Sequence, residues 1–71
     1  MDFTNSEIRT AIDECIHNDM HRDMLKMRLI DGWTYERIAE AVDRSDKNVS
    51  YIIKRFGPLV FEFLYHNRFF Q

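Results

Sequence analysis

The chain has 71 residues, of which 45% are apolar, and its formal net charge is −2 at pH 7. This length suits one small domain, the apolar fraction excludes wholesale disorder, and no apolar run approaches the ~18 residues that span a membrane. The N-terminus lacks a signal-peptide pattern and the single cysteine, Cys15, cannot form an internal disulfide. We therefore expect a cytoplasmic protein.

Two amphipathic helices are expected in the first half of the chain. Thr4 and Glu7 have the spacing of a capping box, and apolar residues then recur at helical spacing over roughly residues 5–17. Asn18 interrupts this pattern and can cap a second helix over residues 20–31. The apolar residues of that second helix wrap more than one face, which indicates a central position.

The stretch 34–56 predicts two short helices joined by a tight turn. Thr34 can cap the first of these helices, and Ser45 can cap the second after the break at Asp43. Each helix carries an apolar stripe at helical spacing. Ala39 is the small residue that a close crossing of the two helices requires.

This pattern resembles the DNA-binding helix-turn-helix, in the version found in the fourth conserved region of bacterial sigma factors and related small bacterial or phage regulators. The residues that carry the resemblance are Thr34, Glu36, Ile38, Ala39, Val42, Ser45, Val49, Ile52 and Arg55. Many family members have glycine at the turn, where this chain has Asp43, which tolerates the left-handed conformation better than most residues. The resemblance implies that the second helix enters the major groove.

The polar side of that second helix supplies the expected DNA contacts. Candidates for contact with base edges are Asp46, Lys47, Asn48, Ser50, Tyr51 and Lys54. Candidates for contact with phosphates are Thr34, Tyr35, Arg44 and Arg55, and the capping Ser45 belongs to the same surface. Residues 44–55 hold four bases and one acid, a net charge of +3, whereas residues 1–31 hold four bases and seven acids. Only the local field at the docking face has to be positive.

A further helix is expected over about residues 58–68, because Gly57 and Pro58 mark a stop and a new start. It is apolar almost all round, and the side chains expected to pack on the body are Leu59, Val60 and Phe63. The remaining large side chains form an expected interface for a homodimer or another protein: Phe61, Leu64, Tyr65, Phe69 and Phe70. Alternatively, the same aromatics fold back and complete a small core.

No catalytic constellation or cofactor motif is recognisable, so we expect neither an enzyme nor a bound cofactor. His17 and His21 are four residues apart, but the break at Asn18 argues against a metal site. The sequence thus predicts an all-α fold of about five helices in one domain and a sequence-specific DNA-binding transcriptional regulator, acting as a homodimer. The alternative is a phage-type repressor modulator or antirepressor that binds another regulatory protein, supported by the net negative charge and the aromatic C-terminal segment.

Overall fold

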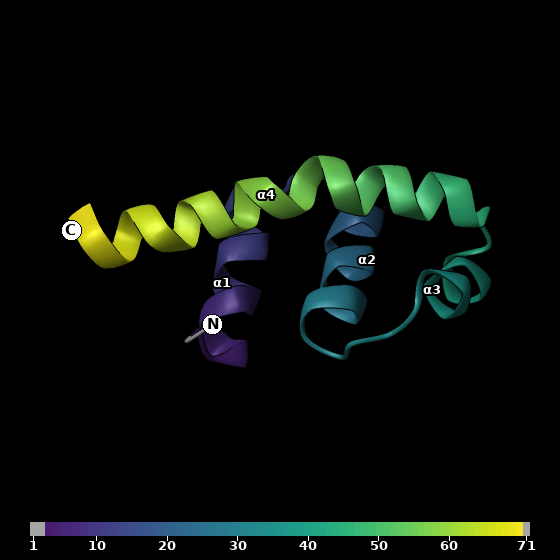
Figure 1. The fold of residues 1–71 in the computed structure, drawn as a ribbon, viewed down its shortest axis with the longest axis horizontal. Coiled ribbons are helices and arrows are strands. Elements are labelled where there is room, and N and C mark those ends of the chain that lie inside the picture. Colours follow the sequence, from purple (N-terminus) through teal and green to yellow (C-terminus); the bar gives the residue numbers. More distant parts are fainter. Residues whose placement is uncertain (1–2, 71) are drawn as a thin grey trace.

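The computed structural model describes residues 3–70, and of Phe69 and Phe70 it describes only the backbone. The helices are α1 (Asn5–Cys15), α2 (Asp19–Leu29), α3 (Tyr35–Val42) and α4 (Asp46–Phe70). α4 runs along the length of the molecule, and the other three helices pack side by side against it (Figure 1). The all-α prediction is confirmed. The expectation of five helices is wrong, because the described residues form four.

The N-terminal caps are those that the sequence predicts. Thr4 Oγ1 accepts from the Glu7 backbone N–H at 3.1 Å, and Glu7 Oε1 accepts from the Thr4 backbone N–H at 2.9 Å, which completes the capping box. Asn18 Oδ1 accepts from the His21 backbone N–H at 3.1 Å at the start of α2. These bonds satisfy amide groups that would otherwise lack partners in the first helical turn.

The segments that flank α3 also follow the sequence prediction. Gly32 has a φ of 71° after α2, and Asp43 has a φ of 57° and a ψ of 49° after α3, so both adopt the left-handed conformation. Thr34 Oγ1 caps α3 by accepting from the Arg37 backbone N–H at 3.1 Å. Ser45 Oγ caps α4 by accepting from the Asn48 backbone N–H at 3.1 Å. The turn between α3 and α4 therefore forms with aspartate at its left-handed position.

One hydrophobic core joins all four helices. Its largest fully buried side chains are Ile12, Met24, Leu25, Ile38, Val49 and Val60. Ala39 is also buried in this cluster, as its small size predicts. Among residues 3–68 no polar or charged side chain is buried, so apolar burial is the main force that holds α4 against the other helices.

The largest departure from the sequence prediction lies at Gly57 and Pro58, which stand inside a continuous α4. Proline within a helix removes one backbone hydrogen bond, here the one to the Lys54 carbonyl, and costs ~3 kcal/mol. Glycine before proline relieves part of the steric conflict, because it has no Cβ to meet the proline ring. The buried residues Val49 and Val60, one on each side of the proline, supply the packing that offsets the remaining cost.

Replacing Pro58 by alanine is therefore expected to stabilise the fold by about 1–3 kcal/mol, since it restores the hydrogen bond to Lys54. Gly57→Ala should add ~0.5–1 kcal/mol in the Pro58→Ala background, because no atom lies within 4 Å of the new Cβ. The same change beside Pro58 should gain less. Urea unfolding of the single and double variants measures this coupling. A loss of stability in Pro58→Ala would show instead that the core requires the proline.

The C-terminal half of α4 is tied to the start of the chain. The Phe3 and Tyr65 rings meet edge to face with centroids 5.2 Å apart, and the Arg68 guanidinium lies 4.2 Å from the Phe3 centroid. Arg68 Nη2 also pairs with Glu7 Oε2 at 3.3 Å. The Glu7 carboxylate thus links the cap of α1 to the last turns of α4.

This link predicts a pH dependence of stability. The backbone hydrogen bond from Thr4, followed by the contacts with Arg68, holds the pKa of Glu7 below its ordinary value of 4.5. A lowered pKa in the folded state means that the carboxylate stabilises the protein above this ordinary value and ceases to do so as the pH falls further. Glu7→Gln should therefore lower the Tm at pH 7, and this loss should shrink as the pH falls below 4.5. Thermal unfolding of this variant and of an exposed control, Glu40→Gln, over a series of pH values measures the difference, and a loss that does not change with pH would contradict it.

Candidate nucleic-acid interface

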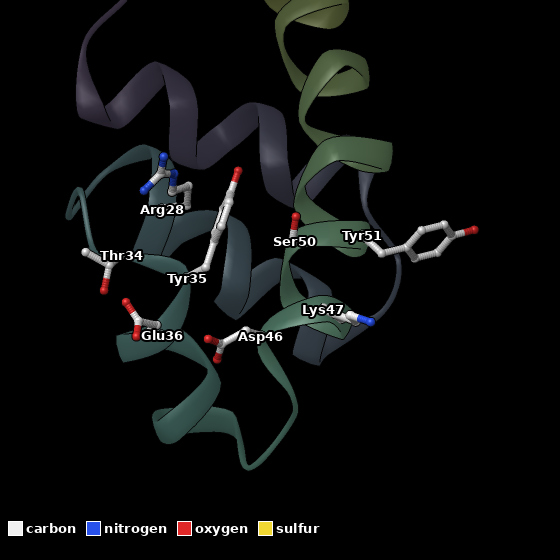
Figure 2. A pocket seen from close by; sticks show the side chains of 8 residues that line it. All are labelled: Arg28, Thr34, Tyr35, Glu36, Asp46, Lys47, Ser50 and Tyr51. Carbon is white, nitrogen blue, oxygen red and sulfur yellow. The ribbon is translucent and has the colours of Figure 1, made fainter.

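The exposed side of the first turns of α4 carries three side chains in line, Lys47, Tyr51 and Lys54, which we call the ridge. Their spacing of four and three residues places them on one side of the helix, opposite the buried Val49 and Ile53. Tyr51 is 58% exposed, the highest value among the large apolar and aromatic side chains of residues 3–68. Figure 2 shows that Lys47 and Tyr51 point away from α3. Two cations thus flank an exposed aromatic ring.

A groove separates the ridge from the start of α3. It has a volume of about 650 Å³ and is lined by Arg28, Thr34, Tyr35, Glu36, Asp46, Lys47, Ser50 and Tyr51 (Figure 2). The Tyr35 ring lies between α3 and α4 beside Ser50, and both residues are half-buried. The structure therefore brings together six of the predicted DNA-binding residues along one groove.

Arg28 is a residue of this site that the sequence did not single out. Its Nη1 donates to the backbone carbonyl of Trp33 at 2.9 Å, and its guanidinium lies 4.5 Å from the centroid of the Tyr35 ring. It therefore holds Tyr35 and the entry to α3 in place. The role of Arg28 depends on contacts between α2 and the start of α3, and the spacing of residues within α2 does not predict these contacts.

Two carboxylates limit where an anion can approach. Glu36 and Asp46 stand on facing walls of the groove, and both are exposed (Figure 2). Their charges oppose those of Arg28 and Lys47 at the groove itself. An anionic partner is therefore favoured on the outer, cationic side of α4, the side that carries the ridge, and not at the base of the groove.

Three other predicted DNA-binding residues lie around the ridge. Arg44 is exposed in the turn before α4, and its backbone N–H donates to the Ala39 carbonyl at 3.0 Å. Arg55 is exposed, and its Nη1 lies 3.5 Å from Tyr51 Oη. Asn48 is exposed in the first turn of α4. None of these three side chains lines the groove beside α3.

No protein-family model, curated protein or solved structure matches this chain. The resemblance to the helix-turn-helix regulators accordingly stays a prediction. The assignment of a function depends on the geometry and charge of the surface described above.

Two leucines in the C-terminal half of α4 lie differently from the prediction. Leu64 is only 6% exposed and belongs to the core, whereas Leu59, expected in the core, is 46% exposed. Phe61 is half-buried. Tyr65 is 45% exposed, and its ring contacts that of Phe3. The side chains of Phe69 and Phe70 lie outside the described residues. The phase of the continuous α4 causes the exchange of Leu59 and Leu64, because Val49 and Val60 fix which side of this helix faces the core.

The remaining candidates give no second site. His21 follows the break at Asn18, and its ring lies 5.1 Å from that of Phe56. Within the described part of the chain no three His, Cys, Asp or Glu side chains are grouped so that they could hold a metal ion. None of the described helices combines the length and the apolar character needed to cross a bilayer.

Proposed function

We propose that the protein binds double-stranded DNA through the ridge and acts as a sequence-specific transcriptional regulator, as a homodimer on a two-fold site. The observation that carries this proposal is the alignment of Lys47, Tyr51 and Lys54 on the exposed side of α4, directly after the turn from α3. An α-helix with its side chains is about 10–12 Å wide, and the major groove is about 12 Å wide. The first turns of α4 therefore fit the major groove of DNA, either end on or along the length of that groove.

The ridge supplies groups suited to base edges. Lysine ammonium groups donate to the O6 and N7 acceptors of guanine, and the apolar edge of a tyrosine ring suits the thymine methyl group. Lys47 and Lys54 lie one on each side of Tyr51, so three neighbouring base pairs are in reach. Asp46, at the margin of this surface, accepts hydrogen bonds from cytosine and repels phosphates.

Phosphate contacts come from the residues around the ridge. Arg44 in the turn and Arg55 on α4 are exposed cations, and Thr34 and Tyr35 lie at the start of α3. Such contacts set the position and orientation of the protein but carry no sequence information. Because Arg44, Arg55 and the two ridge lysines give four cations per subunit, log K should fall with log salt with a slope of about −3 to −4 per subunit.

The test is binding to duplex DNA, followed by fluorescence anisotropy at two salt concentrations. Raising the salt from 50 to 200 mM should weaken binding by each subunit ~10²-fold. Lys54→Ala should weaken binding several-fold and reduce the slope by about 1, since one base contact and one cation at the docking face are lost. Arg9→Ala removes the same charge from α1, which packs on the C-terminal half of α4 away from the ridge, and should leave binding unchanged. Equal effects of the two variants would contradict a role for the ridge.

A second function is favoured by the exposure of Tyr51. Tyrosine is enriched among the residues that dominate binding between proteins, and this ring is 58% exposed on a chain with a net charge of −2. A modulator that binds another regulatory protein through the same ridge would show no affinity for DNA at low salt. Capture of a repressor by the protein in a pull-down, lost in Tyr51→Ala, would then support this alternative.

A further inference from the structure

The C-terminal half of α4 carries a second exposed surface, which we call the seam: Leu59, Glu62, Phe63 and His66. Together with Cys15 of α1 it encloses a groove of about 400 Å³. Leu59 is 46% exposed, and Phe63 is half-buried. Burial, followed by the charge of Glu14, raises the pKa of the Cys15 thiol, so this wall of the groove is uncharged at neutral pH. The spacing of three, one and three residues is that of a contact stripe between two helices.

We propose that the seam binds a second copy of this chain, with the two α4 helices antiparallel, and that this pairing sets the distance between the two DNA half-sites. The inference rests on the proposed function. About twelve residues separate Tyr51 at the centre of the ridge from the centre of the seam, which corresponds to ~18 Å along a helix. A two-fold axis through the seam doubles this to ~35 Å between the two ridges, and one turn of DNA is 34–36 Å.

The direction of the ridge supports the same arrangement. At 3.6 residues per turn, the ridge lies about a quarter turn around α4 from the seam. When the two seams face each other, a two-fold axis perpendicular to both helices places the two ridges on the same side of the dimer. Parallel α4 helices would instead place the two ridges only ~10 Å apart, too close for successive turns of the major groove. The length and the phase of α4 thus both favour a second copy as the occupant.

The register of the pair follows from the position of the axis between Glu62 and Phe63. Leu59 of one copy then lies opposite His66 of the other, which removes the exposed leucine from water. Glu62 lies beside the axis, so the two Glu62 carboxylates approach each other and repel. This repulsion makes Glu62 the unfavourable member of the seam.

Sedimentation equilibrium without DNA tests the pairing. The parent protein should dimerise at micromolar concentrations, and Leu59→Glu should raise the dimer dissociation constant at least about tenfold. Glu62→Gln should lower it. Tyr65→Glu is the matched control, because Tyr65 is 45% exposed, as Leu59 is, but lies about a quarter turn from the seam. A monomeric parent protein, or a dimer that Tyr65→Glu dissociates and Leu59→Glu does not, would overturn the proposal.

Cross-linking tests the orientation. In a Cys15→Ser background, Glu62→Cys should give a covalent dimer with a short bis-maleimide, because residue 62 lies beside the axis in both copies. Glu40→Cys on α3 is the control and should stay monomeric. A parallel pair at the other end of α4 would cross-link through Lys47→Cys and not through Glu62→Cys, which would contradict the antiparallel arrangement.

Selection from random duplex DNA separates this inference from the proposed function. The proposal predicts inverted repeats with half-site centres about 10–10.5 base pairs apart, and direct repeats would contradict it. A seam dimer that enriches no DNA sequence would support the pairing and refute DNA binding. A monomer that enriches a single half-site would do the reverse.

Discussion

Replacing Val60 by glutamate is expected to unfold the protein. Val60 is fully buried in the C-terminal half of α4, beyond Pro58. A carboxylate without a partner at this position costs several kcal/mol, and a fold of this length has a total stability of only about 4–10 kcal/mol. Circular dichroism and thermal unfolding should show the loss of the cooperative transition.

The adjacent residue provides the control. Leu59→Glu changes a side chain that is 46% exposed, so this variant should keep the parent helical content and a cooperative transition. If Val60→Glu stayed folded with the Tm of the parent protein, the second half of α4 would not belong to the core. That result would favour the separate terminal helix that Gly57 and Pro58 indicate in the sequence.

The double variant Lys47→Gln, Lys54→Gln is expected to weaken specific DNA binding ~10²-fold or more. Each lysine contact to a base edge is worth about 1–3 kcal/mol of discrimination, and both cations are lost from the docking face. Both side chains are exposed, so the stability of the fold should change little. Fluorescence anisotropy with a selected duplex and with a scrambled duplex measures the affinity and its dependence on sequence.

A second double variant, Arg44→Gln, Arg55→Gln, carries the same change in charge. Comparing it with the lysine variant separates base contacts from phosphate contacts. It removes phosphate contacts, so it should weaken binding to the selected and the scrambled duplex by similar factors. The lysine variant should weaken binding to the selected duplex more, because the lysines read bases. The assignment of base contacts to the ridge would be wrong if the two variants reduced sequence preference equally.

The local structure could be predicted from the sequence because short-range hydrogen bonds determine it. Thr4, Thr34 and Ser45 each accept from a backbone N–H three residues further on, and such caps depend only on neighbouring residues. The left-handed Asp43 follows from the same kind of argument. The sequence therefore allowed prediction of the turn that leads into α4 and of the exposure of the ridge.

The continuity of α4 was missed because two signals conflict. Glycine and proline are common at helix boundaries, so Gly57 and Pro58 favour two helices, whereas the apolar pattern favours one. The buried residues Val49, Ile53, Val60 and Leu64, with the partly buried Phe56, form one stripe that stays in register across the proline. A stripe without a phase change indicates one helix, because tertiary packing can override a local preference.

The missed parts of the site have the same physical origin. The predicted burial of Leu59 and exposure of Leu64 are reversed in the structure. A separate helix could take any rotation about its axis, whereas in a continuous α4 the buried residues Val49 and Ile53 determine which side faces the core. Arg28 lies in a different helix from the ridge, and only the folded structure shows that it stacks on Tyr35. Contacts between helices therefore determine where Leu59, Leu64 and Arg28 lie, and these contacts cannot be predicted from helical spacing alone.

If the exposed side of the first turns of α4 binds DNA, the amide chemical shifts of the labelled protein should change there as duplex DNA is added at low salt. The largest changes should fall on Lys47, Tyr51 and Lys54 and on the start of α3, and these changes should disappear at high salt. Shifts confined to α1 and the C-terminal half of α4, or no shifts at saturating DNA, would contradict DNA binding by this side of α4.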